Sequence, residues 1–244
     1  MQVLRTLTEL QKFLTSTDCQ SGGFADTGFL YGLAYKDDRL FEVANDVHDL
    51  LADAQIPIYT NVISRMELID LVFRKQVTTG CIQMFNGTTS PSHDKPIYKI
   101  LKDIRDKDTA AVRNGESYKL DENRLKRLRK NIDAEYGINN WPEFCAKYIG
   151  TMLATEWQTL EQEFGLNFIE VMEGEPSPLL ESPLYWADMV EIMAKHGQRA
   201  PDAMIVNLFS NSRFHLLITS DNDLEFCFDD PLGSFEDRAI FLLN

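Results

Sequence analysis

The sequence predicts an α/β protein with a parallel β-sheet that is covered by helices on both faces. Short apolar runs alternate with longer segments of helical periodicity, which is the pattern of successive βαβ units. The strongest run, Leu216 to Ile218, contains no alternating polar residue and therefore indicates a strand that is buried on both faces. The expected strands are residues 23–25, 56–59, 167–172, 215–218 and 238–243.

Helices are expected around these strands. At the N-terminus apolar residues recur at three- and four-residue steps, so the chain should begin as an amphipathic helix. These residues are Val3, Leu4, Leu7, Leu10 and Leu14. Another helix should begin at Thr60–Asn61, after the second strand. Ser182–Pro183 should begin a helix that ends at Gly197, and Ala200–Pro201 should begin the next one.

Length and composition describe a folded protein without disulfide bridges. A chain of 244 residues forms one large domain, or one domain with an insertion, and buries a sizeable core. No apolar run approaches the roughly 18 residues of a membrane helix, and no export leader begins the chain. We therefore expect a protein of the reducing cytoplasm with no membrane partner. The four cysteines form no CxxC pair, which gives a zinc or redox motif no support: Cys19, Cys81, Cys145 and Cys227.

The charge is distributed unevenly along the chain. The formal net charge is -14, which by itself argues against a nucleic-acid partner. Residues 95–130, however, contain 12 Lys and Arg against 6 Asp and Glu, whereas the rest contains 12 against 32. Such a basic run is either a solvated helix face or a set of phosphate contacts. The candidate nucleic-acid contacts are Arg124, Lys126, Arg127, Arg129 and Lys130.

Acidic residues follow two of the expected strands. Asp26 ends the first strand and Asp221 follows the fourth, so both should lie at the carboxyl edge of the sheet, where open parallel sheets bind ligands. Asp202 begins a helix and Glu67 lies near the start of another, and both could reach the same edge. Each aspartate alone is equally well explained as a helix cap. Together, four carboxylates repel one another, and because the acidic motifs contain no lysine or arginine, we expect Mg²⁺ or Mn²⁺ to compensate them. Such a site is suited to the hydrolysis of a phosphodiester or related phosphate ester.

The order of these acids resembles the signature of the PIN-domain nucleases. Residues 26–30 read Asp-Thr-Gly-Phe-Leu, Glu67 follows among apolar neighbours, residues 201–205 read Pro-Asp-Ala-Met-Ile, and residues 219–224 read Thr-Ser-Asp-Asn-Asp-Leu. The family has the chain order Asp, Glu, Asp, Asp and a last motif of the form Thr-x-Asp-x-Asp. The resemblance covers roughly residues 20–80 and 165–244.

This resemblance implies a three-layer α/β/α fold with a parallel sheet of about five strands, and metal-dependent cleavage of RNA. The domain would comprise residues 1–85 and 165–244, with a helical insertion at 86–164. The implied catalytic metal ligands are Asp26, Glu67, Asp202 and Asp221. Asp223 is implied as a fifth metal-binding acid, and the hydroxyls of Thr27 and Thr219 as supporting groups.

Bacterial members of this family resemble the VapC toxins, which form homodimers and are held by an antitoxin segment. A toxin role, a homodimer and an antitoxin partner are therefore expectations of the resemblance. The insertion distinguishes this chain from those toxins.

Two other functions agree with the same sequence. A PIN-like scaffold that binds a protein or RNA partner without cleaving it would have the same fold. A PIN-like nuclease could also act on DNA, although the sequence shows no helix-hairpin-helix glycine pattern.

Overall fold

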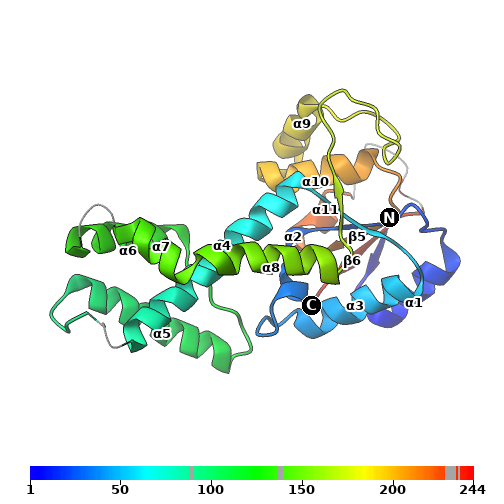
Figure 1. The fold of residues 1–244 in the computed structure, drawn as a ribbon. Helices are drawn as coiled ribbons and strands as arrows, with labels where there is room; N and C mark the ends of the chain where they lie inside the picture. The colour runs from blue at the N-terminus through cyan, green and yellow to red at the C-terminus, as the bar shows by residue number, and fades with distance from the viewer. Residues whose placement is uncertain (88–90, 137–139, 229–234, 236) are drawn as a thin grey trace. The chain divides into compact units, whose positions relative to one another are not determined.

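The computed structural model describes residues 1–87, 91–136, 140–228, 235 and 237–244 (Figure 1). The chain forms two compact units. The first comprises residues 1–36, 40–68 and 162–244 and contains the sheet. The second comprises residues 37–39 and 69–161, and its described part is helical. No helix within the described ranges is both long and apolar enough to span a membrane.

The sheet consists of six strands that are all parallel, in the order β1-β6-β5-β2-β3-β4. An α/β protein with a parallel sheet is confirmed. The five expected strands are present, although β4 is shorter than predicted. The strands are β1 (Gln2–Leu4), β2 (Gly23–Ala25), β3 (Ile58–Asn61), β4 (Asn167–Ile169), β5 (Leu216–Thr219) and β6 (Ala239–Leu242).

The expectation that the chain begins as a helix at Val3 is wrong. Gln2–Leu4 forms β1, which pairs with β6, and helix α1 (Leu7–Ser16) starts only afterwards. Thr6 sets this start, because its hydroxyl accepts the N–H of Glu9 while the Glu9 carboxylate accepts the N–H of Thr6. This capping box stabilises the first turn of a helix that begins at the residue after Thr6.

The strand order reverses beside β2. From β2 the sheet continues to β3 and β4 on one side, and the chain then returns to place β5 on the other side. In doubly wound sheets the crevice beyond the carboxyl ends of two such strands is the usual ligand site. Helix α2 (Thr27–Ala34) leaves the end of β2, and α4 (Val62–Asn86) leaves the end of β3, so both helices begin at this edge.

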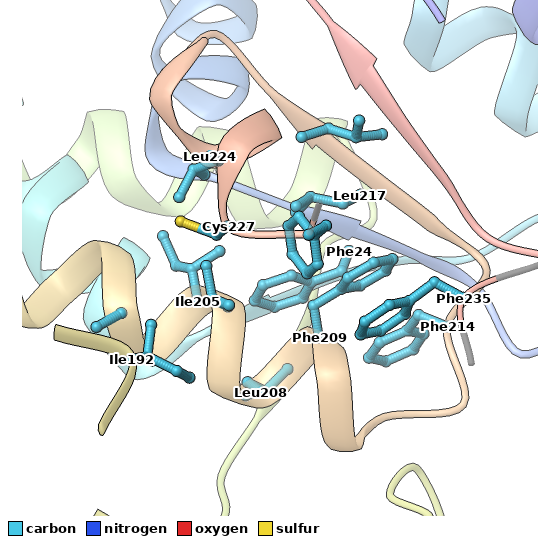
Figure 2. Packing of buried hydrophobic residues seen from close by; sticks show 14 of the residues in the cluster. Phe24, Ile192, Ile205, Leu208, Phe209, Phe214, Leu217, Leu224, Cys227 and Phe235 are labelled. Carbon is cyan, nitrogen blue, oxygen red and sulfur yellow. The ribbon is translucent and has the colours of Figure 1, made fainter. Parts of the chain in front are cut away.

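One face of the sheet is covered by α9 (Trp186–His196), α10 (Ala200–Asn211) and α11 (Asp223–Phe226). Phe24 of β2 and Leu217 of β5 pack against Ile205 and Phe209 of α10 in this cluster, as Figure 2 shows. The opposite face is covered as well, since Leu216, Ile218 and Phe241 are almost completely buried. Helices α1 and α3 (Phe41–Asp53) contribute buried residues to the same unit.

The helix that was expected to begin at Ser182–Pro183 begins instead at Trp186. The hydroxyl of Ser182 bonds the side chain of Asn211 at 2.5 Å, and the N–H of Glu181 donates to the Asn211 carbonyl at 2.8 Å. This segment is therefore extended along the C-terminal end of α10. The predicted end at Gly197 is confirmed, because Gly197 adopts the left-handed conformation with φ of 70°.

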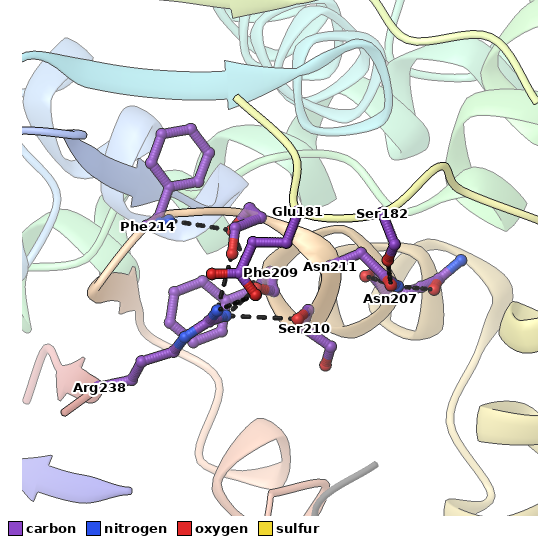
Figure 3. Close-up of polar contacts among 9 residues, drawn as sticks. Glu181, Ser182, Asn207, Phe209, Ser210, Asn211, Phe214 and Arg238 are labelled. Atoms are coloured by element: carbon purple, nitrogen blue, oxygen red, sulfur yellow. Dashed lines mark hydrogen bonds and ion pairs between the residues drawn. The ribbon is translucent and has the colours of Figure 1, made fainter. Parts of the chain in front are cut away.

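Arg238 holds the beginning of β6 against the C-terminal end of α10 (Figure 3). Its guanidinium donates to the carbonyl oxygens of Phe209 at 2.6 Å and Ser212 at 2.8 Å, and forms an ion pair with Glu181 at 3.4 Å. The side chain is nearly buried, and its Cζ lies 5.6 Å from the ring centroid of Phe209 and 5.4 Å from that of Phe235. The last carbonyls of a helix lack partners within the helix, so a buried cation there is well compensated.

The second unit is built from the later part of α4 and from α5 (Pro96–Arg113), α6 (Glu122–Tyr136), α7 (Asn140–Tyr148) and α8 (Gly150–Glu163). It has a hydrophobic cluster of its own, which includes Leu101, Leu128 and Phe144. Gly80 permits close packing here, because a Cβ at this position would lie 2.7 Å from the Cβ of Tyr148. The sequence predicted one long helix from Trp141, whereas the structure breaks it before Gly150, a weak helix former.

Candidate active site

The four acids that the sequence selected belong to four different elements of the first unit. Asp26 directly follows β2 and is the N-cap of α2. Glu67 lies in the second turn of α4, and Asp202 lies in the first turn of α10. Asp221 follows β5. Their placement at strand ends and helix starts agrees with the sequence expectation.

Asp26 both caps a helix and bonds a neighbouring strand. Its Oδ1 accepts the N–H of Thr27 at 2.5 Å, and its Oδ2 accepts the hydroxyl of Thr219 at 2.7 Å. The register that pairs Phe24 with Leu217 places Asp26 beside Thr219 on the same face of the sheet. The capping function considered from the sequence is therefore present, and it leaves one carboxylate oxygen directed across the edge between β2 and β5.

Two threonine hydroxyls connect the acids. Thr219 donates to Asp26, and its Oγ1 accepts the N–H of Asp221 at 3.0 Å. Thr27 donates from its hydroxyl to Oε2 of Glu67 at 2.8 Å. Thr27 thus contacts Glu67, and Thr219 contacts Asp26. Through them, Asp26, Glu67 and Asp221 belong to one hydrogen-bonded group.

Burial and mutual repulsion disfavour the charged forms of two of these carboxyl groups. Burial is the main cause that raises the pKa of Asp26 to about 6, and the negative charges of Glu67 and Asp202 add to the rise. The bonds from Thr219 and Thr27 act in the opposite direction. The pKa of Asp202 is also raised, first by burial and then by Asp221 and Glu67. Each of the four acids therefore lies within electrostatic range of at least one other.

Arg199 is a cation near the acidic group that was not predicted as a site residue. It lies three residues before Asp202, at the N-cap of α10, and its side chain is exposed. Its charge lowers the pKa of Asp202, but burial and the neighbouring acids outweigh this effect. The position of Arg199 just ahead of a helix start that carries an aspartate was visible in the sequence.

The donor chemistry of this group suits a hard divalent cation. All four side chains offer carboxylate oxygens, the ligands that Mg²⁺ and Mn²⁺ prefer. Within the described part of the chain, however, no three His, Cys, Asp or Glu side chains are arranged closely enough to hold an ion as they stand. The carboxylates therefore suit a divalent ion in ligand type and in charge. The described side chains do not, however, form a complete set of metal ligands in their present positions.

Asp223 is the outermost of the acids. It is the first residue of α11, its side chain is exposed, and its N–H donates to Oδ1 of Asp221 at 2.8 Å. It remains near the others, because Asp221, Asp202 and Asp223 all contribute to raising the pKa of the Cys227 thiol after the main effect of burial. Oδ1 of Asp221 thus bonds the start of the following turn, but the N-cap of α11 is Asn222, so the helix cap considered for Asp221 from the sequence is not formed.

The basic residues of α6 do not form one patch. Arg124 and Arg127 line a groove of about 760 Å³ between α5 and α6, whereas Lys126 and Arg129 line a separate groove of about 400 Å³ that also contains Trp141. Lys130 lines neither groove. Arg124 is paired with Asp121 and Asp103, and Lys126 is paired with Glu122. The sequence could not separate these sides of α6, because the division depends on what packs beside the helix.

The chain matches no model of a known protein family, and neither the curated proteins nor the solved structures gave a match. Fold and site together define the class: an α/β protein with an all-parallel sheet and a group of carboxylates at the point where the strand order reverses.

Proposed function

We propose that this protein is a PIN-like endoribonuclease that hydrolyses RNA phosphodiester bonds with Mg²⁺ or Mn²⁺. One observation carries the proposal: Asp26, Glu67, Asp202 and Asp221 converge on the reversal point of a parallel sheet and influence one another electrostatically. Structural acids are normally dispersed or paired with cations. A group of like charges that raises the pKa of its own members is more typical of a functional site.

The roles of the residues follow from their contacts. A bound divalent ion would be held by these four carboxylates, and it would polarise the phosphate and activate a water. Thr219 orients Asp26 from one side while the Thr27 N–H bonds its other oxygen. The Thr27 hydroxyl orients Glu67. Asp223, which is exposed, would act on the outer side of the site as a further metal-binding acid.

The groove between α5 and α6 is the best candidate for contacts to the RNA backbone in the second unit. Its cations are Lys99, Lys107, Arg124 and Arg127. Among the described residues, Lys99 and Arg127 form no ion pair, so their charges are available for phosphates. Asn123 and Asn131 supply neutral hydrogen-bonding groups in the same groove.

Substitution of single acids tests the proposal. Asp26→Asn and Asp221→Asn should each reduce cleavage of a labelled single-stranded RNA in Mg²⁺ by at least about a hundredfold, because mutation of a group that acts with a metal removes most of the catalytic effect. Asp188→Asn is the control, because it makes the same change at an aspartate in the first turn of α9 that does not belong to the acidic group. Full activity in either site variant, with circular dichroism unchanged, would refute the assignment.

The scaffold alternative is favoured by the lack of three closely grouped ligands among the described side chains. Titration of the protein with Mg²⁺ and Mn²⁺ in a calorimeter separates the two functions. Saturable binding that Asp26→Asn abolishes supports the nuclease, whereas no binding at millimolar metal supports the scaffold. Cleavage of a DNA strand of the same sequence in place of RNA would support the third candidate, a PIN-like nuclease acting on DNA.

The toxin role, the antitoxin and the homodimer are proposals that rest on the resemblance alone. Expression of the protein in bacteria, with and without a small neighbouring reading frame, tests the first two. Growth arrest that the neighbouring product relieves would support a toxin and its antitoxin. Light scattering of the purified protein decides between monomer and homodimer.

A further inference from the structure

Two buried polar groups lie next to the acids without a hydrogen-bond partner. Asn61 ends β3 and is 2% exposed, and Ser64 is fully buried in the first turn of α4. Within the described ranges, neither Nδ2 of Asn61 nor Oγ of Ser64 bonds any protein atom. Buried polar groups are almost always hydrogen-bonded to protein or to ordered water, so two such atoms in one helical turn need a partner.

The orientation of the Asn61 side-chain amide is defined by the hydrogen bond that its oxygen accepts. Its Oδ1 accepts the N–H of Ser64 at 2.7 Å, as an N-cap does for α4. An amide oxygen must face that N–H, so Nδ2 is directed away from it and is the donor that lacks a partner. The cap and the free donor are thus separate functions of one side chain.

The strand register places Asn61 beside Asp26. β2 and β3 pair Phe24 with Tyr59, so two residues further along each strand Asp26 is a neighbour of Asn61. Phe24 and Tyr59 both contact the ring of Phe214 and therefore lie on one face, which Asp26 and Asn61 share because side chains alternate. On the other side of β2, the register with β5 likewise places Thr219 beside Asp26, and the two side chains are hydrogen-bonded.

Ser64 is connected to the acidic group through Thr27. Its carbonyl oxygen lies 3.4 Å from Oγ1 of Thr27, whose single hydroxyl proton is donated mainly to Glu67 at 2.8 Å. A carboxylate offers about four acceptor positions, and protein atoms use one on each oxygen of Asp26. One water bonded to Asn61, Ser64 and Asp26 would have the two to four polar partners that buried waters typically have.

We propose that Nδ2 of Asn61 and Oγ of Ser64 hold one ordered water against the Asp26 carboxylate, which makes Asn61 a positioning residue of the acidic site. Thr219 orients Asp26 from the β5 side, and Asn61 orients it from the β3 side through this water. The catalytic part of this proposal rests on the proposed nuclease function. The water site itself does not.

The experiment is a double-mutant cycle with Asn61→Ser and Ser64→Ala, measured by urea denaturation in EDTA. Serine is a good N-cap, so Asn61→Ser keeps the start of α4 and removes only the Nδ2 donor. If both groups bind the same water, each single variant lowers the folding equilibrium constant at least tenfold, and the double variant is not much worse than either single one. If Ser64 lacks a partner, Ser64→Ala removes an unsatisfied hydroxyl and leaves stability unchanged or increased, which overturns the proposal.

The effect of Asn61 on the acidic site is measured by metal binding and by enzyme kinetics. Asn61→Ser should weaken Mn²⁺ binding about tenfold, in line with the effect of groups that orient metal ligands. It should lower kcat for RNA and leave KM nearly unchanged. Asn45→Ser, which removes an amide from α3 at a distance in sequence from the site, is the control and should change neither.

The two proposals fail in distinguishable ways. Coupling in the cycle without any metal binding or RNA cleavage would refute the nuclease and keep the water site. Additive single effects, with cleavage that still depends on Asp26, would refute the water site and keep the nuclease. A crystal structure with no density between Asn61, Ser64 and Asp26 would also overturn the water site.

Discussion

Asp26 has a carboxyl group whose burial disfavours the charged form that a metal site requires. Its pKa is raised to about 6, mainly by burial. The hydrogen bonds from Thr219 and from the Thr27 N–H lower this pKa only in part. The negative charges of Glu67 and Asp202 raise it further. Without metal, the folded protein therefore binds a proton at Asp26 at a pH where the unfolded chain has lost it.

The sign of the resulting pH dependence follows from this difference in protonation. Because the folded pKa lies above the unfolded one, the free energy of unfolding should fall as pH rises from about 4 to about 6, by about 3 kcal/mol for this group. Asp26→Asn carries no charge, so in EDTA it should be more stable than the natural protein above pH 6 and similar to it near pH 4. Urea denaturation of both proteins at pH 4, 6 and 8 measures this. Parallel stability curves would contradict the raised pKa.

Gly28 is required for the close approach of α2 to the turn after β5. A Cβ at this position would lie 2.0 Å from Oγ and 3.0 Å from Cβ of Ser220. Rotation of the Ser220 hydroxyl relieves the first contact, but the second needs a shift of α2 or of the segment that carries Asp221. The glycine thus keeps Asp26 and Asp221 together.

Gly28→Ala should destabilise the protein by about 1–3 kcal/mol, as overpacking typically does. Ser220→Gly removes both clashing atoms, so the double variant should recover most of the loss and most of the RNA cleavage. Thermal denaturation of the two single variants and the double variant provides the comparison. If Ser220→Gly gives no recovery, the cost of Gly28→Ala arises from something other than this contact.

Between elements, Arg238 is the strongest polar connection that the structure describes at the end of α10. Arg238→Met should destabilise the protein by about 3–5 kcal/mol, because it leaves the helix-end carbonyls of Phe209 and Ser212 buried without a donor. Glu181→Gln is the matched control. Glu181 is 60% exposed, so loss of its ion pair should cost less than about 1 kcal/mol. Equal losses in urea denaturation would show that the ion pair, and not the carbonyl bonds, matters.

The success of the sequence predictions differed between elements for physical reasons. Buried strands such as β5 contain an uninterrupted apolar run, here Leu216–Ile218, over a length too short for a helix, so they were predicted well. At the N-terminus, Val3 and Leu4 agree with a strand as well as with a helix, and the capping box at Thr6 decides between the two. Ser182–Pro183 has a typical start signal, but contacts with α10 override it.

The site could be predicted in part for a similar reason. Strand-end acids can be located from sequence, because parallel strands bring their carboxyl ends to one edge. Thr60–Asn61 was read from the sequence only as a helix cap, since the unpaired amide of Asn61 is visible only once its cap bond and burial are known. Whether three acids can close around an ion depends on side-chain rotamers, which periodicity does not encode.

At the scale of the whole molecule, an acidic protein should bind RNA only through the region where its basic residues gather. The net charge is -14, and the excess of Lys and Arg lies in residues 95–130. Several cations there are paired: Lys107 with Asp103, Arg124 with Asp103 and Asp121, Lys102 and Arg105 with Asp106, and Lys126 with Glu122. The unpaired Lys99 and Arg127 in the groove between α5 and α6 should therefore contribute most to phosphate binding.

The double variant Lys99→Ala/Arg127→Ala tests the role of this groove in phosphate binding. The matched control is Lys126→Ala/Arg129→Ala, which removes the same amount of charge from the other side of α6. The first pair should weaken binding of a catalytically protected RNA and reduce the slope of log K against log salt by about 1.4, at about 0.7 for each lost phosphate contact to a single strand. The second pair should change the slope less, because Lys126 is already paired with Glu122 at 2.6 Å. Fluorescence anisotropy over a range of salt concentrations gives both slopes. Equal changes would mean that RNA responds to the overall charge of the helices and not to this groove, and unchanged slopes would identify both sets as solvated helix faces.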